Sequence, residues 1–118
     1  MRNSRLILLG LLLLVSCNTA LRQNAMQIRL AHLDSLLNQM PRVVLDSLEQ
    51  MDISDYPEFD QAYYNLLLTI ARDKAYADFT DDSIISLAAD WYRNGKDPEK
   101  LARSLIYLGI VRYALNPM

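Results

Sequence analysis

The chain has 118 residues, of which 52% are hydrophobic and 22% are charged, and its formal net charge is −2 at pH 7. This length predicts one small domain, and the hydrophobic fraction is high enough for a folded core. One cysteine and one histidine exclude an internal disulfide framework and a zinc site of thiolates and imidazoles. Three glycines leave no room for a Gly-rich phosphate loop, and the weakly acidic charge gives no electrostatic basis for binding nucleic acid.

The first residues have the features of a targeting segment. Arg2 and Arg5 precede an apolar run without a charge at positions 6–15. This is the pattern of a secretory signal peptide, and the run is shorter than the roughly 20 apolar residues that span a bilayer. The segment Leu14-Val15-Ser16-Cys17 then resembles the lipobox of bacterial lipoproteins.

The lipobox resemblance implies that residues 1–16 are removed as a signal peptide and that Cys17 receives a covalent lipid through its sulfur. No other cofactor is expected. Residues 17–27 would form the lipidated N-terminus and a tether, and two or more acyl chains hold a protein stably on a membrane. The alternative is a cleaved signal peptide that is followed by an incidental cysteine.

The residues after Cys17 bear on the location of the protein. In the lipoprotein family an Asp at the next position retains the protein in the inner membrane, and here the residue is Asn18. The resemblance therefore favours the outer membrane. The stretch 18–27 also lacks an acidic cluster of the kind that marks surface-exported lipoproteins, which favours the periplasmic face.

Residues 28–118 carry apolar side chains at helical spacing, and no segment alternates as a strand would. We therefore expect an all-α domain of about five helices arranged as antiparallel hairpins. Pro41 is expected to end the first helix and begin the second. The expected buried rows of these two helices are Ile28, Leu33, Leu36, Leu37 and Met40, then Val44, Leu45, Leu48 and Met51.

The third helix is expected to begin at Pro57 or Glu58 and to continue to about Ala77. A fourth helix follows it. Their expected buried faces are Phe59, Tyr63, Leu66, Leu67, Ile70 and Ala71 in the third helix and Ile84, Ile85, Leu87, Ala88, Trp91 and Tyr92 in the fourth.

Short polar segments should cap these helices. Thr80 or Asp81 is expected to accept the first N–H groups of the fourth helix. Gly95 is expected to end that helix in the left-handed C′ conformation. Asp97 should cap the fifth helix, which begins at Pro98 and runs to about residue 115.

Two similar segments each open a helix, residues 61–68 and residues 102–109, about 41 positions apart. The second resembles the start of a tetratricopeptide repeat, in which a small residue and a Leu-Gly pair allow close packing of neighbouring helices. Its matching residues are Ala102, Leu108, Gly109 and Tyr113. The spacing exceeds the usual repeat of about 34 residues, Leu68 replaces the first Gly, and Tyr113 falls one place late. The resemblance implies a degenerate tetratricopeptide-like α-solenoid fragment over residues 28–118.

No constellation of catalytic residues emerges from the sequence, and we expect no enzyme activity. His32 has no second ligand at metal-binding spacing, and the acidic residues around 73–82 lack the pattern of a calcium loop. Most aromatic residues are expected in the core. Tyr63 and Tyr64 are adjacent and cannot share one face of a helix, so one of them is a candidate for a peptide-binding surface.

The fifth helix has apolar residues on nearly every side: Leu101, Leu105, Ile106, Leu108, Ile110, Val111, Tyr113 and Leu115. An exposed apolar surface of this kind marks an interface. We expect it to be covered by another chain, by a second copy, or by further repeats.

Together these patterns predict a lipid-anchored envelope protein whose helical repeats bind other proteins, as an adaptor or a sensor-like module. The candidate binding or packing residues are Tyr63, Tyr64, Gly109 and Tyr113, and the membrane is contacted through Cys17. The alternative function is a glycan-binding component of the outer membrane.

Overall fold

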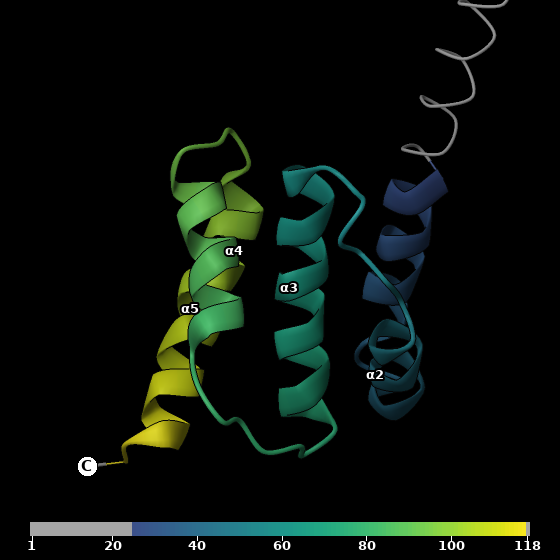
Figure 1. Ribbon diagram of the computed structural model, residues 1–118. Coiled ribbons are helices and arrows are strands. Elements are labelled where there is room, and N and C mark those ends of the chain that lie inside the picture. Colours follow the sequence, from purple (N-terminus) through teal and green to yellow (C-terminus); the bar gives the residue numbers. More distant parts are fainter. Residues whose placement is uncertain (1–24, 118) are drawn as a thin grey trace, which may run out of the picture.

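A computed structural model describes residues 25–117, and these residues form helices and turns without a strand (Figure 1). The first described helix covers residues 25–36. It is followed by α2 (Pro41–Glu49), α3 (Glu58–Lys74), α4 (Ser83–Arg93) and α5 (Pro98–Leu115). The expected all-α fold is confirmed. The signal segment, the lipobox and Cys17 lie outside the described residues, and among residues 25–117 no helix is long and apolar enough to cross a membrane.

Helix α3 lies at the centre of the domain, with α2 on one side and the antiparallel pair α4 and α5 on the other (Figure 1). Because neighbours cover α3 on several sides, ten of its residues are buried, far more than in any other labelled helix. The largest fully buried apolar side chains come from every described helix: Leu30, Val44, Leu45, Leu48, Leu66, Leu67, Ile70, Ile85 and Val111. One core therefore joins all five described helices.

The buried row of the first described helix differs from the expected one. Met26, Leu30, Leu33 and Leu37 face the core, at helical spacing, whereas Ile28 is exposed. Four further residues that were expected to be buried are also exposed on the surface of the described chain: Met40, Phe59, Leu87 and Trp91. These residues lie next to the rows of side chains that face the core. The sequence has more apolar rows than the fold covers, so some apolar side chains stay at the surface.

The expected caps are mostly confirmed. The Asp97 carboxylate accepts a hydrogen bond of 3.1 Å from the backbone N–H of Lys100, and Pro98 occupies the first turn of α5. The Asp81 carboxylate accepts the N–H of Ser83 at 2.9 Å, as α4 begins. The prediction for Gly95 is wrong, because no glycine among the described residues has a positive φ.

The left-handed helix end is instead at the C-terminus of α3, where Tyr76 has a φ of 57°. The N–H of Ala77 donates to the carbonyl of Arg72 at 2.8 Å, and the N–H of Tyr76 donates to the carbonyl of Asp73 at 3.2 Å. These two bonds form a Schellman motif, which usually has glycine at the C′ position that Tyr76 occupies. The helix therefore stops at Lys74, three residues before the expected end.

Replacing Tyr76 with Gly should stabilise the domain. The left-handed conformation costs a residue with a Cβ about 1 kcal/mol or more, and the Tyr76 side chain is 95% exposed, so little packing is lost. We expect the free energy of unfolding to rise by up to about 1 kcal/mol, less the entropy that glycine adds to the unfolded chain. Urea unfolding measures this. Tyr76→Ala keeps the Cβ and serves as the control, and equal stability of the Gly and Ala variants would contradict the strained backbone.

A polar cluster links the first described helix, α3 and α5. The Asp34 carboxylate accepts two hydrogen bonds from the Arg103 guanidinium, at 2.8 and 2.9 Å, from a residue 69 positions away. It also accepts a hydrogen bond of 2.6 Å from the hydroxyl of Tyr63 on α3. The Lys100 ammonium lies 4.6 Å from the centre of the Tyr63 ring. This cluster sets the relative positions of three helices.

Burial alone would raise the pKa of the Asp34 carboxyl. The hydrogen bonds from Arg103 and Tyr63, together with the nearby positive charges of Arg103 and Lys100, outweigh burial and hold that pKa below its ordinary value of 3.8. The ionised carboxylate is thus the form that the fold favours. Burial, and to a lesser degree the hydrogen bond to Asp34, raises the pKa of the Tyr63 hydroxyl.

Asp34→Asn should lower the free energy of unfolding by about 1–2 kcal/mol at neutral pH, between the values for exposed and for buried ion pairs. Because the folded-state pKa of Asp34 is depressed, its stabilisation is present above the unfolded-state pKa and is lost as the pH falls through the folded-state pKa. The difference between the two proteins should therefore shrink as the pH falls below the ordinary Asp pKa of 3.8.

Asp46→Asn is the matched control for this prediction, because Asp46 occupies the same place in a second Leu-Asp-Ser-Leu tetrad and is exposed. Its weak contact with Arg42 is 3.8 Å long, so a change within about 0.5 kcal/mol is expected. Equal losses in the two variants at neutral pH would show that the Asp34 cluster has no special role.

Candidate functional site

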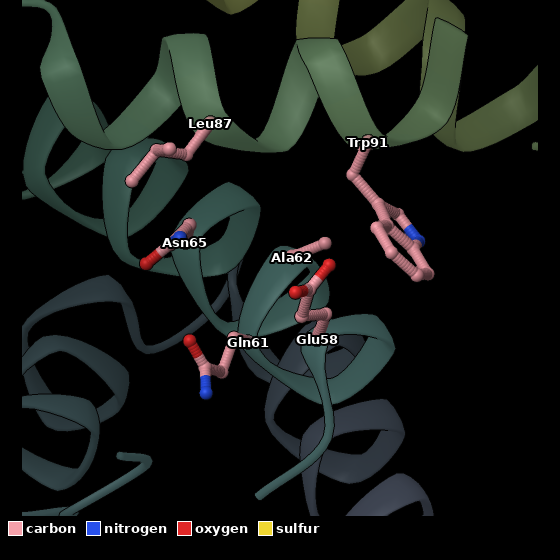
Figure 2. Close-up of a pocket in the computed structure, with 6 residues that line it drawn as sticks. All are labelled: Glu58, Gln61, Ala62, Asn65, Leu87 and Trp91. Carbon is pink, nitrogen blue, oxygen red and sulfur yellow. The ribbon is translucent and has the colours of Figure 1, made fainter. Parts of the chain in front are cut away.

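An open groove lies between α3 and α4, with a volume of about 270 Å³ (Figure 2). Its α3 edge consists of Glu58, Gln61, Ala62 and Asn65, and its α4 edge consists of Leu87 and Trp91. These positions are spaced by three, four and seven residues, so each set lies along one face of its helix. The groove therefore follows the line along which the two helices pack.

The α4 edge of the groove is apolar. Leu87 is 62% exposed and Trp91 is 38% exposed, and both side chains project from α4 toward α3 (Figure 2). They lie beside the row that α4 buries in the core, which consists of Ile85, Ala88, Ala89 and Tyr92. Exposed indole rings are enriched at protein interfaces, where they supply large contact areas. Leu87 and Trp91 were both expected in the core, and this prediction is wrong for both of them.

The α3 edge of the groove is polar. The Gln61 side chain lines the groove, and its amide nitrogen donates hydrogen bonds of 2.8 and 3.4 Å to the carbonyls of Tyr56 and Ser54 in the segment before α3. Asn65 lies one turn further along α3, and Glu58 places a carboxylate in the first turn of the same helix. An amide can both donate and accept hydrogen bonds. The groove thus offers an apolar edge opposite a row of hydrogen-bonding groups.

The tyrosines predicted for a binding surface are both buried. Tyr63 is covered on the side of the first described helix and α5, where its hydroxyl meets Asp34. Tyr64 is covered on the side of α2, where its hydroxyl donates to the carbonyl of Leu48 at 2.7 Å. They do point to different faces of α3, as expected, but the central position of that helix covers both faces. Tyr63 also lines a hollow of about 200 Å³ with Trp91 and Lys100, but its ring is buried.

Gly109 and Tyr113 lie on the exposed side of α5. A Cβ at Gly109 would meet no atom within 4 Å, so the close packing on a neighbouring helix that the repeat resemblance implies is absent within the described chain. Tyr113 is 66% exposed. The four predicted site residues therefore fall in two separate places, two in the packing around α3 and two on the face of α5.

Two other polar features lie outside the groove. A shallow hollow of about 220 Å³ lies between the first described helix, α3 and α5, but its main charges, Asp34 and Arg103, are engaged with each other. Asp60 is fully buried in α3 and accepts a hydrogen bond from Gln27, while its second oxygen has no partner among the described residues. Within residues 25–117 no three His, Cys, Asp or Glu side chains are placed to hold a metal ion.

A signal for the groove was present in the sequence. The fourth helix carries two apolar rows, one with Ile85 and Ala88 and another with Leu87 and Trp91. A helix that packs on one side can bury only one such row. The expectation that both rows are buried is wrong, because the fold leaves the row with Leu87 and Trp91 at the surface.

Comparisons of the chain with models of protein families, with curated proteins and with solved structures find no match. The residues themselves therefore carry the functional conclusion, and their strongest feature is the groove that joins Leu87 and Trp91 to the amide row of α3.

Proposed function

We propose that this chain is a lipid-anchored protein of the bacterial envelope that binds another protein through its helical domain and has no catalytic role. The observation that carries this proposal is the groove between α3 and α4. Its indole and leucine edge suits an apolar side chain of a partner segment, and its amide edge suits backbone N–H and C=O groups. The anchor is supported by the lipobox resemblance at residues 14–17.

The proposal includes a degenerate tetratricopeptide-like architecture. It is supported by the way consecutive helices pack, since α3 and α4 form an antiparallel hairpin and α5 packs on α4 and also touches α3. Arrays of this kind bind partners along the surfaces that their stacked helices form. An outer-membrane anchor with the domain in the periplasm would present this surface to other envelope proteins.

The alternative, a glycan-binding role, concerns the same groove. The face of an indole and the neighbouring side-chain amides supply the apolar contact and the hydrogen bonds that a sugar ring requires, and Trp91, Gln61 and Asn65 bring these groups together. We favour the protein partner because the groove is open along its length and two of its six residues form a continuous apolar edge.

Cys17→Ala should release the protein from the membrane fraction. The substitution removes the only cysteine of the chain, so no acyl chain can attach at this position. Among residues 25–117 no helix is long and apolar enough to cross a membrane. Cell fractionation with metabolic labelling by a fatty acid measures both effects. Ser16→Ala keeps a small residue before the cysteine and should leave acylation intact. Membrane association of the Cys17→Ala variant equal to that of the parent would contradict the anchor.

Trp91→Ala should weaken binding of the partner by at least about tenfold, as expected for a central aromatic contact. A photoreactive amino acid at Leu87 of the full chain, in the native envelope, should give one discrete adduct that the Trp91→Ala variant loses. Tyr76→Ala removes a more exposed ring outside the groove and should retain the adduct.

The same variants separate the two functions. If envelope glycans are retained by the parent and released by Trp91→Ala, and no protein adduct forms, the glycan-binding function replaces the proposed one. An adduct that survives Trp91→Ala would show that the groove is not the binding site.

A further inference from the structure

The solvent-facing side of α5 has an ordered composition along its length. Its exposed residues between the start of the helix and Tyr113 are Pro98, Glu99, Ala102, Leu105, Ile106, Gly109, Arg112 and Tyr113. The acid lies near one end, the base lies near the other, and large apolar residues lie in the middle with a small residue on each side. Leu105, Ile106 and Tyr113 are 42%, 59% and 66% exposed, and such residues gathered on one face form an apolar patch of the kind that marks an interface.

This face is complementary to itself when two copies of α5 run in opposite directions. In a register centred between Leu105 and Ile106, Leu105 of one copy faces Ile106 of the other, and Ala102 faces Gly109. The same register places Glu99 opposite Arg112, at both ends of the contact. Every exposed position in this face is matched by another exposed position, and no like charges meet.

Gly109 adds an independent observation. A glycine inside a helix is destabilising relative to alanine, and nothing in the described chain needs it, because the space beside its Cα is open. A missing side chain at this place allows the backbone of another helix to come close. In the antiparallel register the residue that approaches Gly109 is Ala102, which is also small.

We propose that α5 packs antiparallel against α5 of a second copy of this chain, about a two-fold axis between Leu105 and Ile106. Two-fold pairing is the commonest form of self-association, and it requires a face that matches itself. The interface lies on α5, whereas the groove proposed for the partner is formed by α3 and α4. The inference therefore goes beyond the proposed function, and a dimer would present two grooves.

The charges at the ends of the face allow a direct test with the full chain in detergent. Glu99→Lys and Arg112→Glu should each raise the dissociation constant of the dimer about tenfold, because each places like charges opposite each other at both ends. The double variant Glu99→Lys/Arg112→Glu restores opposite charges and should return to within about threefold of the parent. Sedimentation velocity over a range of concentrations measures the dissociation constants.

Asp82→Asn is the matched control. Arg112 donates through Nε to Asp82 at 2.9 Å within one chain, so this variant removes the internal partner of Arg112 without changing the proposed interface. Its dissociation constant should equal that of the parent. A monomeric parent, or a double variant as weak as the single variants, would overturn the proposal, and so would an Asp82→Asn variant that weakens the dimer as much as Arg112→Glu.

Crosslinking in the envelope tests the register and the identity of the occupant together. Chains with Ala102→Cys, co-expressed with chains carrying Gly109→Cys, should form a mixed disulfide. Either variant alone should form little, because its two cysteines lie about 10 Å apart along the helix axis. Disulfides in the single variants but not in the mixture would overturn the antiparallel register. No disulfide in any combination, with Leu105 attached to a different protein in photocrosslinking, would show that a second copy is not the occupant.

Discussion

The arrangement of the domain follows from the burial of α3 on several sides at once. Ten residues of this helix are covered, including the adjacent pair Tyr63 and Tyr64, whose hydroxyls bond to Asp34 of the first described helix and to the carbonyl of Leu48 in α2. Such a helix needs neighbours all round, and the other helices supply them. One face of each neighbouring helix is then buried against α3, and any apolar residues on its other faces stay at the surface.

This constraint explains why the apolar surface gathers on α4 and α5. Helix α4 buries small residues, Ala88 and Ala89, which let it lie close to the centre while Leu87 and Trp91 remain beside the contact. Helix α5 buries Ser104, Leu108 and Val111, and its opposite face keeps Leu105, Ile106 and Tyr113. The Asp34–Arg103 pair links α5 to the first described helix.

Helix positions and most caps could be predicted from the sequence, because proline, capping residues and apolar spacing act locally. Pro41, Asp97 and Pro98 begin helices as expected. The ending of α3 could not be predicted, because Tyr76 adopts a conformation that its residue type disfavours. The identical Leu-Asp-Ser-Leu tetrads around Asp34 and Asp46 also have different surroundings. Asp34 bonds to Arg103, whereas Asp46 lies at the surface. Only the tertiary arrangement separates them.

The candidate site was harder to predict for a related reason. Apolar spacing identifies the faces of a helix that avoid water, and it does not tell whether a neighbour in the same chain or a partner covers them. Trp91 and Tyr92 are adjacent in one helix, yet Tyr92 is buried in the core and Trp91 borders an open groove. The two aromatic tyrosines of α3 were the natural candidates for a surface, but the central position of that helix removes them from it.

The domain completes its own core and leaves the indole edge of the groove open at its surface. Trp91 is the only tryptophan of the chain, so its fluorescence reports on this edge alone. In the full chain without a partner, we expect the red-shifted emission of a partly hydrated indole, readily quenched by acrylamide, and unaffected by Glu99→Lys on α5. A blue-shifted emission that resists quenching would show that Trp91 is already covered within the chain, and it would contradict an open groove at this edge.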